Sequence, residues 1–176
     1  MDAKMTHTHF GQYLLSKIME SELPSLFPIS DNTFFGVNVE QILEACKPQS
    51  VSFLPKTYIE FMQVFGKNAV PLFSHDSNIS FDTLDYAKDI AIECLQDDKS
   101  PLVLPLDALI FQTCHVSRFQ FFLTANQEDD PPVYLYFYDD PTQFQLIADR
   151  LSAYYFDQLA QKIKEAHYFR SLRRKR

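Results

Sequence analysis

The sequence predicts an α+β fold in which a single domain packs helices against an antiparallel-rich sheet of about four to six strands. Apolar residues recur at helical spacing through the first half of the chain. Three runs of aromatic and β-branched residues then follow one another. A polar, proline-rich turn joins the last two of these runs, so we expect them to form an antiparallel hairpin.

Three helices are expected first. Apolar residues at helical spacing predict a helix over residues 8–22. Asn38 is a good N-cap for a second helix that runs to about Cys46. Pro55 suits the first position of a third helix, because proline has no N–H to leave unpaired there. Gly66 suits a left-handed stop at its end.

The segments around these helices follow from their breakers and caps. Residues 24–36 contain two prolines and are expected to be loop. Residues 69–74 indicate a short edge strand, because Pro71 cannot donate to a central ladder. Ser80 is expected to cap a fourth helix, which ends in the polar run 96–100.

The last part of the chain predicts the sheet and a closing helix. The three strand-like runs are residues 106–113, 119–125 and 133–138, and in the last of them both faces are expected to be covered. Residues 126–132 form the turn between the second and third runs. A final helix is expected over about 144–168, where residues 149–152 allow a break.

Composition and charge limit the kind of partner. Sixteen Lys and Arg stand against twenty-three Asp and Glu in 176 residues, for a formal net charge of −7. Residues 1–169 hold eleven of these cations and all of the acids, so their net charge is −12. An acidic body repels nucleic acid and favours basic partners. The remaining cations are Arg170, Arg173, Arg174, Lys175 and Arg176.

Other sequence features bear on the class of protein and its location. The three glycines are too far apart for a phosphate-binding loop. Cys46, Cys94 and Cys114 are odd in number and widely spaced, which suits reduced thiols better than a disulfide framework. No signal peptide or membrane-spanning run is visible. The sequence therefore predicts a cytoplasmic protein without membrane insertion.

The order of motifs resembles the SUKH superfamily, which includes the cell-wall-assembly-regulator (Smi/Knr) domains. Residues 54–61 are similar to that family's Leu-Pro-x-x-Tyr-x-x-Phe helix start. Residues 106–111 and 119–123 look like its central strands, and 129–136 like its acidic, proline-gated strand. In place of the family's usual Asn-Gly-Gly, this chain has Phe-Gly-Lys-Asn at 65–68.

This resemblance implies a domain organisation and a function. The SUKH-like domain would span residues 38–168, with an N-terminal helical extension over 1–37 and a basic C-terminal tail over 169–176. The resemblance also implies a non-catalytic fold without cofactor or metal. Many bacterial members are immunity proteins that bind and neutralise a toxin, often a nuclease. That expectation agrees with the charge, because nucleases present basic surfaces to their substrate.

The residues expected to bind a partner are acids and tyrosines around the predicted hairpin. Acids precede and follow the run 133–138, and as hairpin neighbours they could cluster into one acidic edge. Solvated turn acids are the simpler interpretation. The candidate partner-binding residues are Glu128, Asp129, Asp130, Tyr134, Tyr136, Tyr138, Asp139 and Asp140.

Alternative functions rest on weaker patterns. A small hydrolase or metal enzyme could use Cys114 with His115, or His7, His9 and His75. Strand neighbours point to opposite faces, however, and these histidines lack metal-ligand spacing. The aromatic strands are better explained by core packing than by base stacking, because their local charges are acidic. The basic tail leaves a regulatory or nucleic-acid accessory role open, with a solvated helix end as the simpler interpretation.

Overall fold

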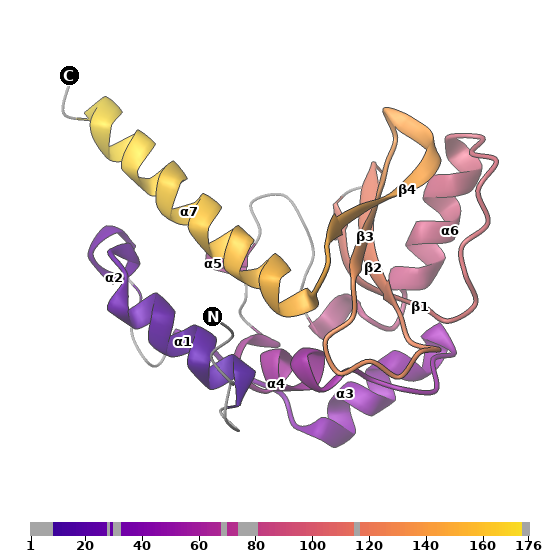
Figure 1. Cartoon of the computed structure of the whole chain (residues 1–176), viewed down its shortest axis with the longest axis horizontal. Helices are drawn as coiled ribbons and strands as arrows, with labels where there is room; N and C mark the ends of the chain where they lie inside the picture. Colours follow the sequence, from indigo (N-terminus) through magenta and orange to yellow (C-terminus); the bar gives the residue numbers. More distant parts are fainter. Residues whose placement is uncertain are drawn as a thin grey trace.

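The computed structural model describes residues 9–27, 29, 33–67, 70–73, 81–114 and 117–173 (Figure 1). It confirms the α+β class: within these residues, helices pack on a four-stranded antiparallel sheet. The strand order β1-β2-β3-β4 follows the chain, so the sheet is a simple meander. The strands are β1 (Ala108–Cys114), β2 (Arg118–Leu123), β3 (Val133–Phe137) and β4 (Asp140–Ala148).

Most of the helices precede the sheet in the chain. Short 3₁₀ turns lie at Lys47–Gln49 and Phe81–Thr83. The α-helices are α1 (Phe10–Glu20), α2 (Leu23–Leu26), α3 (Val39–Cys46), α4 (Lys56–Phe65), α5 (Val70–Phe73), α6 (Ala87–Asp97) and α7 (Leu151–Arg173).

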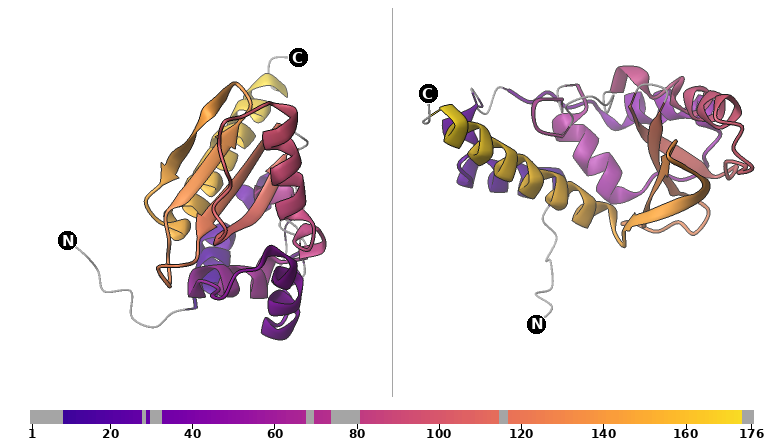
Figure 2. Two further views of the ribbon diagram at one scale, coloured as in Figure 1. Left: turned by 90° about the vertical axis from the view of Figure 1, so that its right-hand side faces the viewer. Right: turned by 90° about the horizontal axis from the view of Figure 1, so that it is seen from above.

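The sheet separates two hydrophobic cores. Helix α6 covers one face, where Ala91 and Cys94 pack among Ile110, Phe119 and Tyr136 (Figure 2). The larger core lies on the other face, between the sheet and helices α1, α4, α5 and α7. Many of its members are aromatic, and two of them are stacked: the rings of Phe61 and Tyr155 are 3.8 Å apart and nearly parallel.

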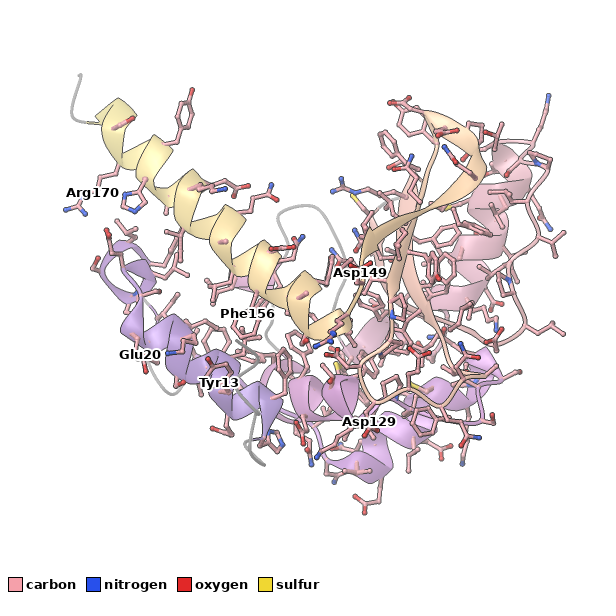
Figure 3. All side chains as sticks on the ribbon, viewed as in Figure 1. Tyr13, Glu20, Asp129, Asp149, Phe156 and Arg170 are labelled. Atoms are coloured by element: carbon pink, nitrogen blue, oxygen red, sulfur yellow. The ribbon has the colours of Figure 1, made fainter. Side chains whose placement is uncertain are left out.

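Helix α1 belongs to the larger core. A Cβ on Gly11 would lie 2.1 Å from the carbonyl oxygen of Glu60, so only glycine permits this close approach of α1 to α4. The Phe10 N–H donates to the Glu60 carboxylate at 2.5 Å. Tyr13 and Phe156 meet edge to face at 5.9 Å between α1 and α7 (Figure 3). Helix α1, which lies in the predicted extension 1–37, thus shares one core with the sheet.

The first three predicted helix starts hold to within two residues. Asn38 caps α3 with a full capping box, in which its side chain accepts from the Gln41 N–H and the Gln41 side chain accepts from the Asn38 N–H. Pro55 directly precedes α4 and is its N-cap. The prediction that Gly66 adopts a left-handed conformation is wrong. Its φ is −53°, which is right-handed. Glycine is needed there for close packing, since a Cβ would lie 2.6 Å from the Met62 carbonyl oxygen.

The prediction of a helix over 144–168 is wrong at its start. Residues 144–148 belong to strand β4, and α7 begins at Leu151. Within β4, Phe144 packs against the α6-side core and Ile147 against the larger core, so the strand serves both faces. Helix α7 also runs beyond the predicted end, through Arg173.

The segments between the early helices also differ from the predictions. Val70–Phe73 is one turn of helix rather than an edge strand, and Phe73 packs edge-on against Phe61 at 5.3 Å. Residues 24–26, expected to be loop, belong to α2. Helix α6 begins at Ala87, after the 3₁₀ turn; the predicted cap Ser80 lies outside the described residues.

Candidate binding surface on helix α6

The structure does not gather the predicted partner-binding residues into one edge. Glu128, Asp129 and Asp130 precede β3, whereas Tyr138, Asp139 and Asp140 follow it. Five extended residues span about 17 Å, so the two acidic groups lie at opposite ends of the strand. Figure 3 labels Asp129 at the end of the sheet that lies over α3 and α4.

The acids of the β2–β3 turn have mostly structural partners. The Asp130 carboxylate accepts from the Ser152 N–H at 2.8 Å and from the Ser152 hydroxyl at 2.5 Å, which fixes the start of α7. The Asp129 carbonyl oxygen accepts from the Thr57 N–H at 3.0 Å and ties the turn to α4. Glu128 is exposed.

The predicted tyrosines fall into different environments. Tyr136 is fully buried and stacks on Phe119 at 5.0 Å, so its assignment to a binding surface is wrong. Its hydroxyl donates to Asp98 at 2.8 Å, and burial, followed by this bond, raises the pKa of Tyr136 to about 12. Tyr134 is half-buried on Phe121, and Tyr138 is 49% exposed. Burial of Phe119, Phe121 and Phe122 confirms that these strands pack a core.

The β3–β4 turn lies against the end of α6. The Ser100 hydroxyl donates to the Pro141 carbonyl oxygen at 2.6 Å, and the bond between Tyr136 and Asp98 makes a second link. Asp140 is held ionised there, because hydrogen bonds from Gln143 and then Thr142 lower the pKa of its carboxyl group. Asp139 and Asp140 therefore join the acids of α6 rather than those of the β2–β3 turn.

Helix α6 and the turn before it carry a row of acids spaced four residues apart. Asp85, Asp89, Glu93 and Asp97, here named the acidic row, are all exposed. Among the described residues none of these four carboxylates has an ion-pair partner. Like charges four apart on a helix repel, and Glu93 and Asp97 also lie toward the negative end of the helix dipole. The row therefore costs stability.

The negative potential of this row reaches the core beneath it. Burial raises the pKa of the Cys94 thiol to about 11, and the charges of Asp98, Asp97 and Glu93 contribute to that rise. Cys94 lies on the sheet-facing side of α6.

An apolar groove runs beside the acidic row. After α6 the chain turns back along the helix (Figure 2) and encloses an open groove of about 550 Å³, here named the α6 groove. Three apolar side chains in it face solvent: Leu106 is 89% exposed, Val103 is 84% exposed and Ile92 is 39% exposed. The groove is lined by Lys88, Ile92, Leu95, Gln96, Lys99, Ser100, Leu102, Val103, Leu104 and Leu106.

Lys88 holds the shape of the groove. Its Nζ donates to the carbonyl oxygens of Leu106 and Gln49, each at 2.7 Å, and so ties the returning segment to the helix. Burial lowers the pKa of Lys88. Since its ammonium group is occupied by two carbonyls, it does not pair with the acidic row. Apolar side chains and unpaired carboxylates therefore stand side by side on this face.

Sequence reasoning missed this surface, although its signals were present. Acids at 85, 89, 93 and 97 keep helical spacing, and the run Leu-Val-Leu-Pro-Leu at 102–106 follows the polar end of α6. Acids that are consecutive in the sequence drew the prediction to the turns, whereas these four acids are neighbours only on the surface of a helix. The exposure of Val103 and Leu106 could not be told from hydrophobicity, which indicates burial.

The residues behind the alternative functions do not form a second site in the described part of the chain. Cys114 is buried, and His7, His75 and His115 lie outside the described residues. His9 shares a hydrogen bond of 2.9 Å with Gln63. No cluster of three or more His, Cys, Asp or Glu suited to a metal ion occurs among the described residues. Arg170 is exposed on α7.

Two further findings concern the molecule as a whole. None of the described helices combines the length and apolar character that a bilayer crossing requires. In comparisons with known proteins no family model matches the chain, and neither a curated protein nor a solved structure matches it.

Proposed function

We propose that this chain is a non-catalytic, SUKH-type domain that binds a basic protein, and that its role is to neutralise a toxin by covering the toxin's active site. The observation that carries this proposal is the acidic row beside the α6 groove. The same face includes the Asp139 and Asp140 end of the predicted site. The other predicted acids, Glu128 to Asp130, lie outside it.

The chemistry of the α6 face suits a basic protein partner. Unpaired carboxylates attract a cationic surface and speed its approach. An apolar groove beside them can take an aliphatic or aromatic side chain, which is the usual source of affinity at a protein interface. A toxin that acts on nucleic acid has to present cations at its active site, and those cations are complementary to the acidic row.

Binding explains the groove better than catalysis does. Two of its polar side chains are already engaged: Lys88 donates to two carbonyls and the Ser100 hydroxyl to the Pro141 carbonyl. The lining residues include no histidine or carboxylate that could activate a nucleophile. The three cysteines are free and buried, which supports a reducing location such as the cytoplasm.

The proposal is tested by binding to the toxin-like product of a neighbouring gene. Association and dissociation rates of the two purified proteins are measured from about 50 mM to about 500 mM NaCl. We expect the association rate to fall steeply with salt. The variant Asp89→Asn/Glu93→Gln should associate about tenfold more slowly at low salt.

A matched control removes the same charge elsewhere. Glu40 on α3 and Asp157 on α7 are exposed, so Glu40→Gln/Asp157→Asn should bind like the parent chain. A third variant, Glu128→Gln/Asp129→Asn, tests the other end of the sheet. An association rate that is flat with salt, or a larger loss in either of these variants, would contradict the proposal.

A further inference from the structure

The two ends of the molecule carry opposite charges. The acidic row places four exposed carboxylates on α6 and the turn before it, and none of them has an ion-pair partner among the described residues. At the other end, Arg170 is exposed near the end of α7, and the chain continues into further cations. Here the name basic segment means residues 170–176, which contain five cations and no acid.

Within one molecule Arg170, in the described part of the basic segment, lies far from the acidic row. Helix α7 has 23 residues and is therefore about 35 Å long. Figures 1 and 2 show that it leads away from the sheet, while α6 lies on the opposite side of the molecule. Figure 3 labels Arg170 at the far end of α7. The exposed Arg170 can therefore approach the acidic row only of a second molecule.

We propose that the basic segment of one copy binds the α6 face of a second copy. The inference rests on the proposed function in one respect, since it assigns a second occupant to the same surface. In the absence of a toxin, the chain would associate with itself, and a basic toxin would compete with the basic segment of the neighbour. Self-association would then cover the α6 face until a toxin displaces the basic segment.

The dimensions of the two charged regions agree. From Asp85 to Asp97 the acidic row extends over about 18 Å at helical rise. Seven residues reach from about 10 Å in a helix to about 23 Å when extended, so five cations can approach the four carboxylates.

Such a contact is head-to-tail. The donor surface on α7 and the acceptor surface on α6 are different parts of the molecule, so the contact is heterologous and does not close as a two-fold dimer. Each copy retains a free segment at one end and a free α6 face at the other. We therefore expect short chains of copies whose mean length rises with concentration and falls with salt.

Sedimentation velocity of the full-length chain tests the proposal. At about 50 mM NaCl the weight-average sedimentation coefficient should rise with protein concentration, and at about 500 mM NaCl it should be that of a monomer. Asp89→Asn/Glu93→Gln removes the acceptor, and Arg170→Gln/Arg173→Gln removes the donor. Each variant alone should associate about tenfold more weakly than the parent. The control Glu40→Gln/Asp157→Asn should associate like the parent chain.

An equimolar mixture of the two variants gives the decisive result. The intact basic segment of the acceptor variant can bind the intact α6 face of the donor variant, so the mixture should regain association. At concentrations where each variant alone stays monomeric, that association should give mainly a one-to-one heterodimer, because each partner's other surface binds about tenfold more weakly. Circular dichroism of each variant checks that the exposed substitutions leave the fold intact.

Three outcomes would overturn the inference. They are a parent chain that stays monomeric at about 50 mM NaCl, association that persists in both variants, and a mixture that fails to form the heterodimer. None of them contradicts the proposed function, which depends on the rate of binding to a toxin. Conversely, a toxin that ignores the acidic row would leave the self-association result standing.

Discussion

Gln49 completes the outer edge of strand β1. Its side chain is fully buried, and its Nε2 donates to the carbonyl oxygens of Leu84 at 2.9 Å and Ile110 at 3.0 Å. Its Oε1 accepts from the Ile110 N–H at 2.7 Å. One amide group thus pairs both backbone groups of Ile110, as a neighbouring strand would do. This prevents the edge from presenting unpaired groups at that position.

Replacing Gln49 with alanine should be costly. The substitution leaves the N–H and C=O of Ile110 buried without these partners, and we expect unfolding free energy to fall by about 3 kcal/mol. Urea denaturation followed by circular dichroism measures this. Gln12→Ala, on the exposed side of α1, is the matched control and should change stability by less than about 0.5 kcal/mol. An equal loss in both variants would contradict the role assigned to Gln49.

The buried thiols should be unreactive in the folded chain. Burial raises the pKa of Cys46 to about 12 and the pKa of Cys94 to about 11. Near pH 8 the thiolate fraction of Cys94 is then about a hundredfold below that of an ordinary thiol. Alkylation with iodoacetamide, followed by peptide mass spectrometry, should label both residues at least about a hundredfold more slowly than in guanidinium chloride. Rapid labelling of either residue in the native state would contradict this burial.

Single residues differ in how far the sequence could predict their roles. Asn38 could be assigned as a cap because capping depends on a local pattern of three or four residues. The burial of Tyr136 could not be predicted in the same way. In the run 133–138 every residue is apolar or aromatic, so alternation does not mark the face that α6 covers.

At the scale of elements, α6 combines a binding surface with a stability cost. Glu93→Lys should make the helix more stable, because it replaces two repulsive pairs, with Asp89 and with Asp97, by two attractive ones. A lysine near the helix C-terminus also suits the dipole. We expect unfolding free energy to rise by about 1 kcal/mol, as measured by urea denaturation.

The control for this change is Glu93→Gln, which removes the repulsion without adding attraction. It should give roughly half of the gain. Both variants should bind the proposed basic partner more weakly although they fold more stably, which is the usual relation between a strained site and its function. If Glu93→Lys lowered stability, the acidic row would have a structural partner, and the surface would have to be reinterpreted.

Strand β4 is one of the elements that the sequence predicts wrongly. Apolar residues at 144 and 146–148 extend the helical spacing found from Leu151 onward, even though residues 149–152 allow a break. What makes 144–148 a strand is the partner β3, which pairs Tyr134 with Leu146 and Leu135 with Gln145. Such pairing depends on tertiary structure and leaves no local signal in the sequence. The hairpin of β2 and β3, in contrast, could be predicted from the local turn 126–132.

At the scale of the whole molecule, the acids proved to be arranged by helix geometry rather than by turns. The charge of −12 over residues 1–169 could be read from the sequence, and it remains the basis of the proposed function. The position of that charge could not be read, because β3 separates the acids at its two ends and α6 brings distant ones into line. A surface built from two elements needs the packing of those elements to become visible.

This uneven distribution of charge also predicts how the molecule responds to salt. Without residues 170–176 the net charge changes from −7 to −12, so the chain should repel itself more strongly. Salt screens this repulsion. From about 20 mM to about 300 mM NaCl, the melting temperature of the shortened chain should therefore rise by a few degrees more than that of the full chain.

The comparison should be made at low protein concentration, where self-association does not add to stability. A full-length variant with glutamine at Arg170, Arg173, Arg174, Lys175 and Arg176 serves as control, because it has the same net charge as the shortened chain and keeps its length. If repulsion is the cause, both variants should gain the same number of degrees with salt. If only the shortened chain does so, the effect comes from losing the last turn of α7. If neither variant gains stability with salt, repulsion among the acids of residues 1–169 does not measurably destabilise the fold, and the prediction fails.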